Sequence, residues 1–158
     1  PAPHEPCPCE QRQVVGIVRN TNQGEIDVSN SVRARVQDPA VLQFADDLIA
    51  ENTLANSTLA RISMDYGIPP DPSPIATATI AHTRQSIQTL NRLSGHALDL
   101  AFVQLQIDDN LTNLTAMDTY WMTKATTPVV VTYLQNRRAA IVAHYTRAQL
   151  ILQHLNGH

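Results

Sequence analysis

The sequence predicts an all-α protein folded as a four-helix bundle, with a Pro-rich crossover and one short extra helix. Apolar residues recur at spacings of three and four along most of the 158 residues, which is the period of one buried helix face. Proline follows a capping residue at Asp38-Pro39 and at Thr127-Pro128, a pattern typical of helix starts. With only 4% aromatic residues and 5 glycines, an all-β sandwich is not expected.

The length and charge of the chain limit the classes of function that the protein can have. A chain of 158 residues is long enough for one domain with a substantial core. The 11 Lys and Arg residues are outnumbered by 14 Asp and Glu, and no basic run could neutralise a row of phosphates, so nucleic acid is not an expected partner. No apolar stretch approaches the roughly 18 residues of a membrane span, so no transmembrane segment is predicted. The sparsely charged surface favours self-association.

The first ten residues, PAPHEPCPCE, differ from the rest of the chain. Their prolines fix φ and remove backbone donors, so neither helix nor sheet is expected there. We predict an extended Pro-rich N-terminal arm over residues 1–10 and a bundle domain over residues 11–158. No charged or apolar leader precedes the arm, which fits either a cytosolic protein or an exported one whose leader has been removed.

Turn and cap residues divide the bundle domain into helices. Gly67 ends one helix, and the connector IPPDPSP, residues 68–74, cannot be helical. Ser94-Gly95 breaks the chain again after the short helix. In order, the predicted helices cover residues 11–37, 39–66, about 75–93, about 96–124 and 128 to about 155.

Each of the four long helices carries a polar residue on its apolar face. Counted from the hairpin turns near Gln37 and Thr126, at a rise of ~1.5 Å per residue, the two polar residues of each hairpin lie at nearly the same height. Four side chains should therefore meet in one layer of the core. We interpret the predicted layer as a structural hydrogen-bonded network, with a ligand or metal site as the alternative; its members are Glu25, Asn52, Asn110 and His144.

Four segments carry a family resemblance: QGEIDVSNS, FADDLIAENTLANSTL, LSGHALDLAF and IVAHYTRA. The matching positions include Glu25, Asn56, Asp99, Phe102 and His144. Together these segments resemble a ferritin-like family of exported bacterial proteins known as domain of unknown function 4142. The resemblance covers about residues 14–155 and implies a ferritin-like bundle and export from the cytoplasm.

The chain departs from that family's pattern at its histidines. Where the family usually has an Asp-His pair in the second helix, this sequence has Glu51-Asn52, and Asn110 replaces a second histidine. Only His144 remains. A di-iron site of the ferritin type needs two Glu-x-x-His motifs, and this sequence has none, so a ferroxidase or di-iron oxygenase is not expected. Binding of one metal is the weaker alternative, through Glu25, Glu51, Asp108, Asp109 and His144.

The arm offers a second candidate site. Cys7 and Cys9 close a loop that we expect to be too small for a comfortable intrachain disulfide. With no third cysteine in the chain, an intersubunit disulfide is the favoured interpretation in an oxidising compartment. Soft-metal ligation by both cysteines with His4 is the alternative.

These observations favour a non-enzymatic protein without catalytic residues or a cofactor. We expect an exported, self-assembling structural subunit of an extracellular or cell-surface assembly, homo-oligomeric and linked through its N-terminal arm. The alternative is a periplasmic stress-related or metal-binding ferritin-like protein.

Overall fold

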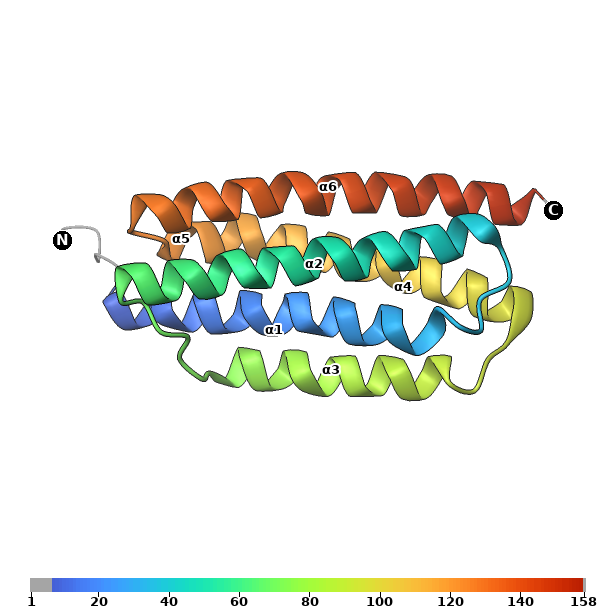
Figure 1. The fold of residues 1–158 in the computed structure, drawn as a ribbon, viewed down its shortest axis with the longest axis horizontal. Coiled ribbons are helices and arrows are strands. Elements are labelled where there is room, and N and C mark those ends of the chain that lie inside the picture. Colours follow the sequence, from blue (N-terminus) through green and yellow to red (C-terminus); the bar gives the residue numbers. More distant parts are fainter. Residues whose placement is uncertain (1–6, 158) are drawn as a thin grey trace.

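The computed structural model describes residues 7–157, and over this range the protein is all-α with no strand. Five helical stretches follow one another along the chain (Figure 1), because α4, η1 and α5 form one continuous stretch. The elements are α1 (Pro8–Val32), α2 (Pro39–Tyr66), α3 (Pro74–Leu90), α4 (Gly95–Ala116), the π-helical turn η1 (Met117–Trp121), α5 (Met122–Lys124) and α6 (Pro128–Asn156). The predicted all-α class is confirmed.

The helices lie side by side along the long axis of the molecule (Figure 1). α1 packs against α2, and α4 against α6, so the two predicted hairpins are present. The short helix α3 runs back along the outside of α1 and carries the chain from one hairpin to the other. Between the two hairpins, α2 and α6 are only lightly in contact with each other.

Most of the predicted helix boundaries follow from capping. Asp38 accepts the backbone N–H of Ala40 at 2.8 Å, and α2 begins at the next residue. Gly67 ends α2 with φ at 62°, in the left-handed region that favours glycine. Ser73 accepts the N–H of Ala76 at 3.1 Å at the start of α3.

The last part of the predicted extended arm, residues 8–10, is helical. α1 begins at Pro8, because proline fits the first turn of a helix, where backbone N–H groups have no intrahelical acceptor. Cys7 is the N-cap, and Glu10 accepts its backbone N–H at 3.0 Å. Helix over residues 8–10 therefore contradicts the predicted boundary, and residues 1–6 lie outside the described range.

The first helix also ends earlier than predicted, at Val32 instead of near Gln37. Buried Asp99 on α4 accepts the backbone N–H groups of Gln37 and Asp38, both at 2.8 Å. These two donors are thereby held outside the helix, and the α1–α2 turn is fixed to the second hairpin.

The apolar core is divided into two clusters. Both contain residues from α1, α2, α6 and the continuous stretch of α4 and η1, but at different heights of the bundle. One cluster is centred on Val14, Leu59, Met117, Trp121 and Leu134. The other is centred on Val32, Phe44, Leu98, Phe102 and Ala148.

The connector between α2 and α3 docks on α1 at a glycine. Asp71 donates its backbone N–H to the carbonyl of Arg12 at 3.0 Å, and its carboxylate pairs with the Arg12 guanidinium at 2.9 Å. A Cβ at Gly16 would lie 2.4 Å from the carbonyl oxygen of Asp71. This close approach requires glycine at position 16.

We expect Gly16→Ala to lower the free energy of unfolding by about 1–2 kcal/mol, because the backbone clash outweighs the gain of roughly 1 kcal/mol in helix propensity. Gly24→Ala is the matched control. Its Cβ would meet only the Thr83 hydroxyl, at 2.4 Å, and that side chain is able to rotate away. Chemical denaturation measures both variants, and equal stability of the two would contradict the docking role of Gly16.

Candidate functional site

A layer of polar side chains separates the two apolar clusters. The four predicted residues all lie in it, and Asn52, Asn110 and His144 are buried. Two further side chains belong to the same layer: Gln106 of α4, which is 0% exposed, and Arg137 of α6. From here on the polar layer denotes Glu25, Asn52, Gln106, Asn110, Arg137 and His144.

The four predicted residues make no hydrogen bond to one another. Each instead has a neighbour that the prediction left out. Arg137 donates from Nη2 to the side-chain oxygen of Asn52 at 2.9 Å, and Asn110 donates to the backbone carbonyl of Gln106 at 2.7 Å. The two missed members could have been found, because Arg137 continues the seam of α6 and Gln106 stands four residues before Asn110.

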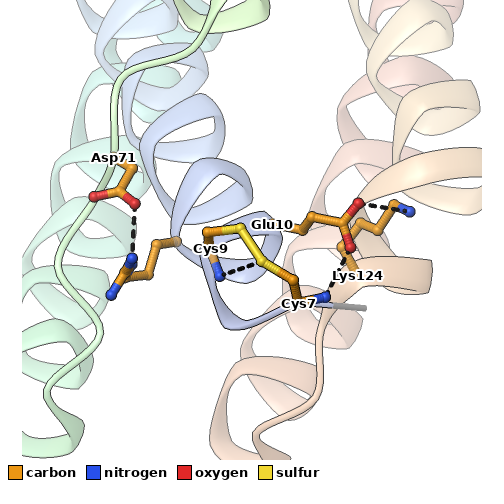
Figure 2. Close-up of a disulfide and its surroundings, with 6 residues drawn as sticks. Cys7, Cys9, Glu10, Asp71 and Lys124 are labelled. Carbon is orange, nitrogen blue, oxygen red and sulfur yellow. Dashed lines mark hydrogen bonds and ion pairs between the residues drawn. A yellow bond between two sulfur atoms is a disulfide. The ribbon is translucent and has the colours of Figure 1, made fainter. Parts of the chain in front are cut away.

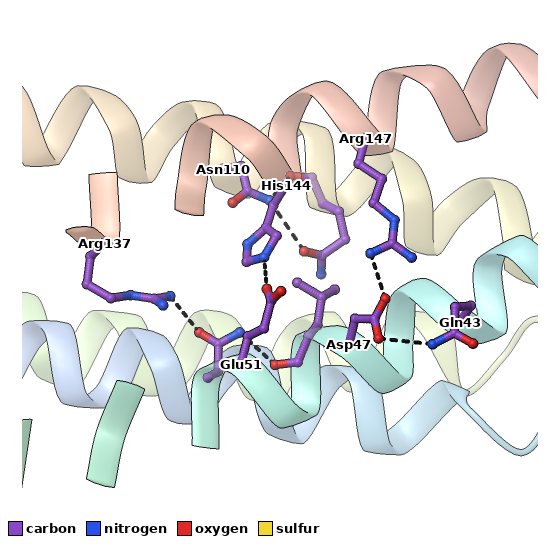
Figure 3. A network of polar contacts seen from close by, with 10 residues as sticks. Gln43, Asp47, Glu51, Asn110, Arg137, His144 and Arg147 are labelled. Atoms are coloured by element: carbon purple, nitrogen blue, oxygen red, sulfur yellow. Dashed lines mark hydrogen bonds and ion pairs between the residues drawn. The ribbon is translucent and has the colours of Figure 1, made fainter. Parts of the chain in front are cut away.

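His144 pairs with Glu51 across the gap between α6 and α2 (Figure 3). The imidazole also lies edge-on to Phe44, with ring centroids 6.4 Å apart. Burial lowers the pKa of His144 below its ordinary value, against the opposing effect of the Glu51 carboxylate. Arg137 and Arg147 add to the lowering. The folded protein therefore favours the neutral imidazole.

This pair lines an open cleft between α2 and α6, the α2–α6 cleft, which has a volume of about 420 Å³. Arg137 and His144 reach it from the polar layer. At one end Arg147 pairs with Asp47 at 2.8 Å (Figure 3). The remaining lining includes Glu51, Leu54, Ala55, Ala140 and Ala143.

Glu25 faces the opposite side of the bundle, in a groove of about 280 Å³ between α1, α3 and α4. The pKa of Glu25 is raised to about 7, mainly by burial and also by the nearby Asp109 carboxylate, against the opposing effects of Gln106, Arg137 and His82. Its Oε2 is buried and accepts no hydrogen bond. Glu25 is thus a carboxyl group that the folded state keeps largely protonated below neutral pH.

Asp109 and His82 form a pair beside Glu25 in the same groove, 2.9 Å apart. Burial raises the pKa of Asp109, and its bond to His82 partly offsets that effect. His82 comes from α3, so the outer helix supplies a side chain that periodicity along the four long helices did not identify.

The residues suggested for a single metal do not come together. Glu51 and His144 lie at the α2–α6 cleft, whereas Glu25 and Asp109 lie in the groove on the other side. Asp108 bonds to Gln104 at 3.0 Å on an exposed face. Within residues 7–157, no three His, Cys, Asp or Glu side chains are grouped so that they could hold a metal ion.

The cysteines form an intrachain disulfide, which contradicts the predicted intersubunit bond and the alternative of soft-metal ligation (Figure 2). The extended backbone of Cys7 turns into the first turn of α1 at Cys9, and this change of direction brings their Cα atoms to 5.3 Å. That separation lies within the normal span of a disulfide. His4 lies outside the described residues.

None of the helices within residues 7–157 combines the length and apolarity needed to cross a membrane.

A comparison with protein families gives one match. The model of the family described as domain of unknown function (DUF4142) matches residues 2–151, and this confirms the resemblance that the sequence showed. No curated protein and no solved structure matches the chain.

The raised pKa of Glu25 predicts a pH-dependent stability. Between the ordinary value of 4.5 and about 7, the folded state binds more protons than the unfolded state, so stability falls as the pH rises. His144, with a lowered pKa, gives the opposite slope below 6.5. Comparison with Glu25→Gln cancels the contribution of His144.

We expect Glu25→Gln to gain about 3 kcal/mol relative to the wild type between pH 4.5 and pH 8, the energy of a shift from 4.5 to about 7. Urea denaturation at several pH values measures this difference. Two stability curves that stay parallel over the whole range would show that Glu25 ionises normally.

Proposed function

The chain belongs to the DUF4142 family, and from that premise we propose that it is an exported, non-enzymatic ferritin-like bundle that acts by binding a small ligand at its polar layer. The α2–α6 cleft is the entrance to this layer. The proposal takes up the binding-protein alternative of the sequence analysis, without the metal.

One observation carries the proposal: polar side chains interrupt the core, and the interruption is open to solvent through the α2–α6 cleft. A purely structural network needs no opening. Arg137 Nε is buried without an acceptor, so the layer is incompletely satisfied by the protein itself. Such groups commonly mark a place where a bound molecule or water completes the hydrogen bonding.

The disulfide supports export. Cys7 and Cys9 are both oxidised at the start of α1, and disulfides persist in oxidising compartments outside the cytoplasm. The hydrogen bonds of the layer support the proposal that the protein is not an enzyme. Asn52, Asn110 and His144 are each hydrogen-bonded to another residue of the protein.

The proposal is tested by making the layer apolar. Residues kept for binding commonly cost stability, whereas residues kept for structure add to it. We therefore expect Asn52→Leu combined with Arg137→Met to unfold cooperatively and at the same or a higher temperature than the wild type. The measurement is made at pH 5, where Glu25 is protonated, so that removing the Arg137 charge does not destabilise an ionised Glu25.

Asp99→Ala is the control for this experiment. Asp99 is a buried polar residue with a structural role, and losing its two hydrogen bonds should cost about 2–4 kcal/mol. If the double variant loses as much stability as Asp99→Ala, the polar layer is structural and the binding proposal fails.

Self-assembly is a second candidate function. Several large apolar side chains stay exposed outside the α2–α6 cleft, among them Met64 and Leu150, at 83% and 60%. Exposed apolar surface of this kind favours association between copies. The intrachain disulfide removes the covalent link, so any assembly depends on surface contacts.

Sedimentation velocity at several concentrations tests this second function. Because both sulfurs are bound within one chain, the double variant Cys7→Ser, Cys9→Ser should show the same size distribution as the wild type. If the double variant or the reduced wild type dissociates, the assembly is instead held by an intersubunit disulfide. A wild type that stays monomeric at every concentration would exclude self-assembly.

A further inference from the structure

We propose that the ligand of the α2–α6 cleft is an amphiphilic carboxylate, whose charged head binds Arg137 and whose apolar part lies along Leu54, Ala140 and Ala143. This inference rests on the proposed function, since it names the ligand class for the same cleft. It requires an unneutralised cation in the cleft, charges nearby that are already paired, and an apolar wall beside them.

Arg137 provides the cation. Arg137 is one of the residues that line the cleft, and its one hydrogen bond among the described residues goes to the neutral side chain of Asn52. Its Nε has no acceptor. Arginine presents its N–H groups as a planar fork that matches a carboxylate, so the group is suited to a carboxylate ligand.

The other charged groups in the cleft already have partners. Arg147 is bound to Asp47 at 2.8 Å, and the Glu51 carboxylate is hydrogen-bonded to His144 instead of contacting Arg137. Glu25 influences Arg137 only from the far side of the layer, and it is partly neutralised by protonation. An anion that enters the cleft would thus find in Arg137 a cation that no carboxylate of the described residues contacts.

The wall of the cleft accounts for the amphiphilic part of the ligand. Leu54 of α2 is 69% exposed there, facing the small side chains of Ala140 and Ala143 on α6. Small residues on α6 leave open volume, about 420 Å³ in total, within the roughly 300–1,000 Å³ of ordinary ligand sites. An aliphatic chain placed here would cover Leu54 without disturbing the charged pairs.

The test uses isothermal titration calorimetry of the full chain with decanoate, below the concentration at which it forms micelles. Decyltrimethylammonium, decanol and acetate serve as comparison probes, since they reverse the charge, remove it or remove the chain. We expect decanoate to bind to one site per chain, and the three other probes to bind at least about 10-fold more weakly, as for loss of one charged hydrogen bond or of the apolar contact.

Two variants locate the site. Arg137→Gln should weaken decanoate binding about 10-fold or more, while Arg138→Gln is a matched control, because Arg138 pairs with Asp118 at 2.7 Å on an exposed face. Ala140→Phe should abolish binding by filling the cleft, with Arg137 untouched. Far-ultraviolet circular dichroism confirms that each variant is folded.

The outcomes separate this inference from the proposed function. If decanol or decyltrimethylammonium binds as tightly as decanoate and Ala140→Phe abolishes it, the cleft binds ligands but not through a carboxylate, and only the inference fails. If decanoate binding survives Ala140→Phe or is equal in Arg137→Gln and Arg138→Gln, the site is elsewhere and the inference is overturned. If no probe binds, the inference also fails, and the apolar-layer variant decides the proposed function by itself.

Discussion

The need to pair buried polar groups sets the register of the whole bundle. Every long helix places a polar residue at mid-length, between two blocks of apolar side chains. Sliding α2 or α6 by a single turn would separate the side-chain oxygen of Asn52 from Arg137, and Glu51 from His144, at a cost of about 1–3 kcal/mol for each lost pairing. The arrangement in which the polar residues share one level is therefore strongly preferred over its shifted alternatives.

Much of this arrangement was predictable from the sequence. The seams with spacings of three and four placed Glu25, Asn52, Asn110 and His144 at one level, and the caps at Asp38 and Gly67 set the ends of α2. These features depend on local periodicity and backbone preferences, which a single sequence expresses directly. The partners of the layer depend on three-dimensional packing, so Arg137 was on the seam but its bond to Asn52 was not foreseen.

The errors of prediction have a common physical origin. The prolines near the N-terminus predict a segment without helix, although Pro8 lies in the first turn of α1, where a missing N–H removes no intrahelical bond. The Cys7–Cys9 pair was judged from its short spacing, although the turn from an extended N-cap into a helix shortens the distance between the Cα atoms. In both cases the decisive geometry belongs to the helix start, where one residue is extended and the next is helical.

Arg137 connects the two sides of the polar layer. It lines the α2–α6 cleft, and its charge also lowers the pKa of Glu25 on the opposite side. An anion bound to Arg137 would cancel part of this charge, so Glu25 would hold its proton to a higher pH. Because such coupling is reciprocal, protonated Glu25 leaves Arg137 more attractive to an anion than ionised Glu25 does. A ligand in the cleft and a proton in the groove would then favour each other through the charge of Arg137.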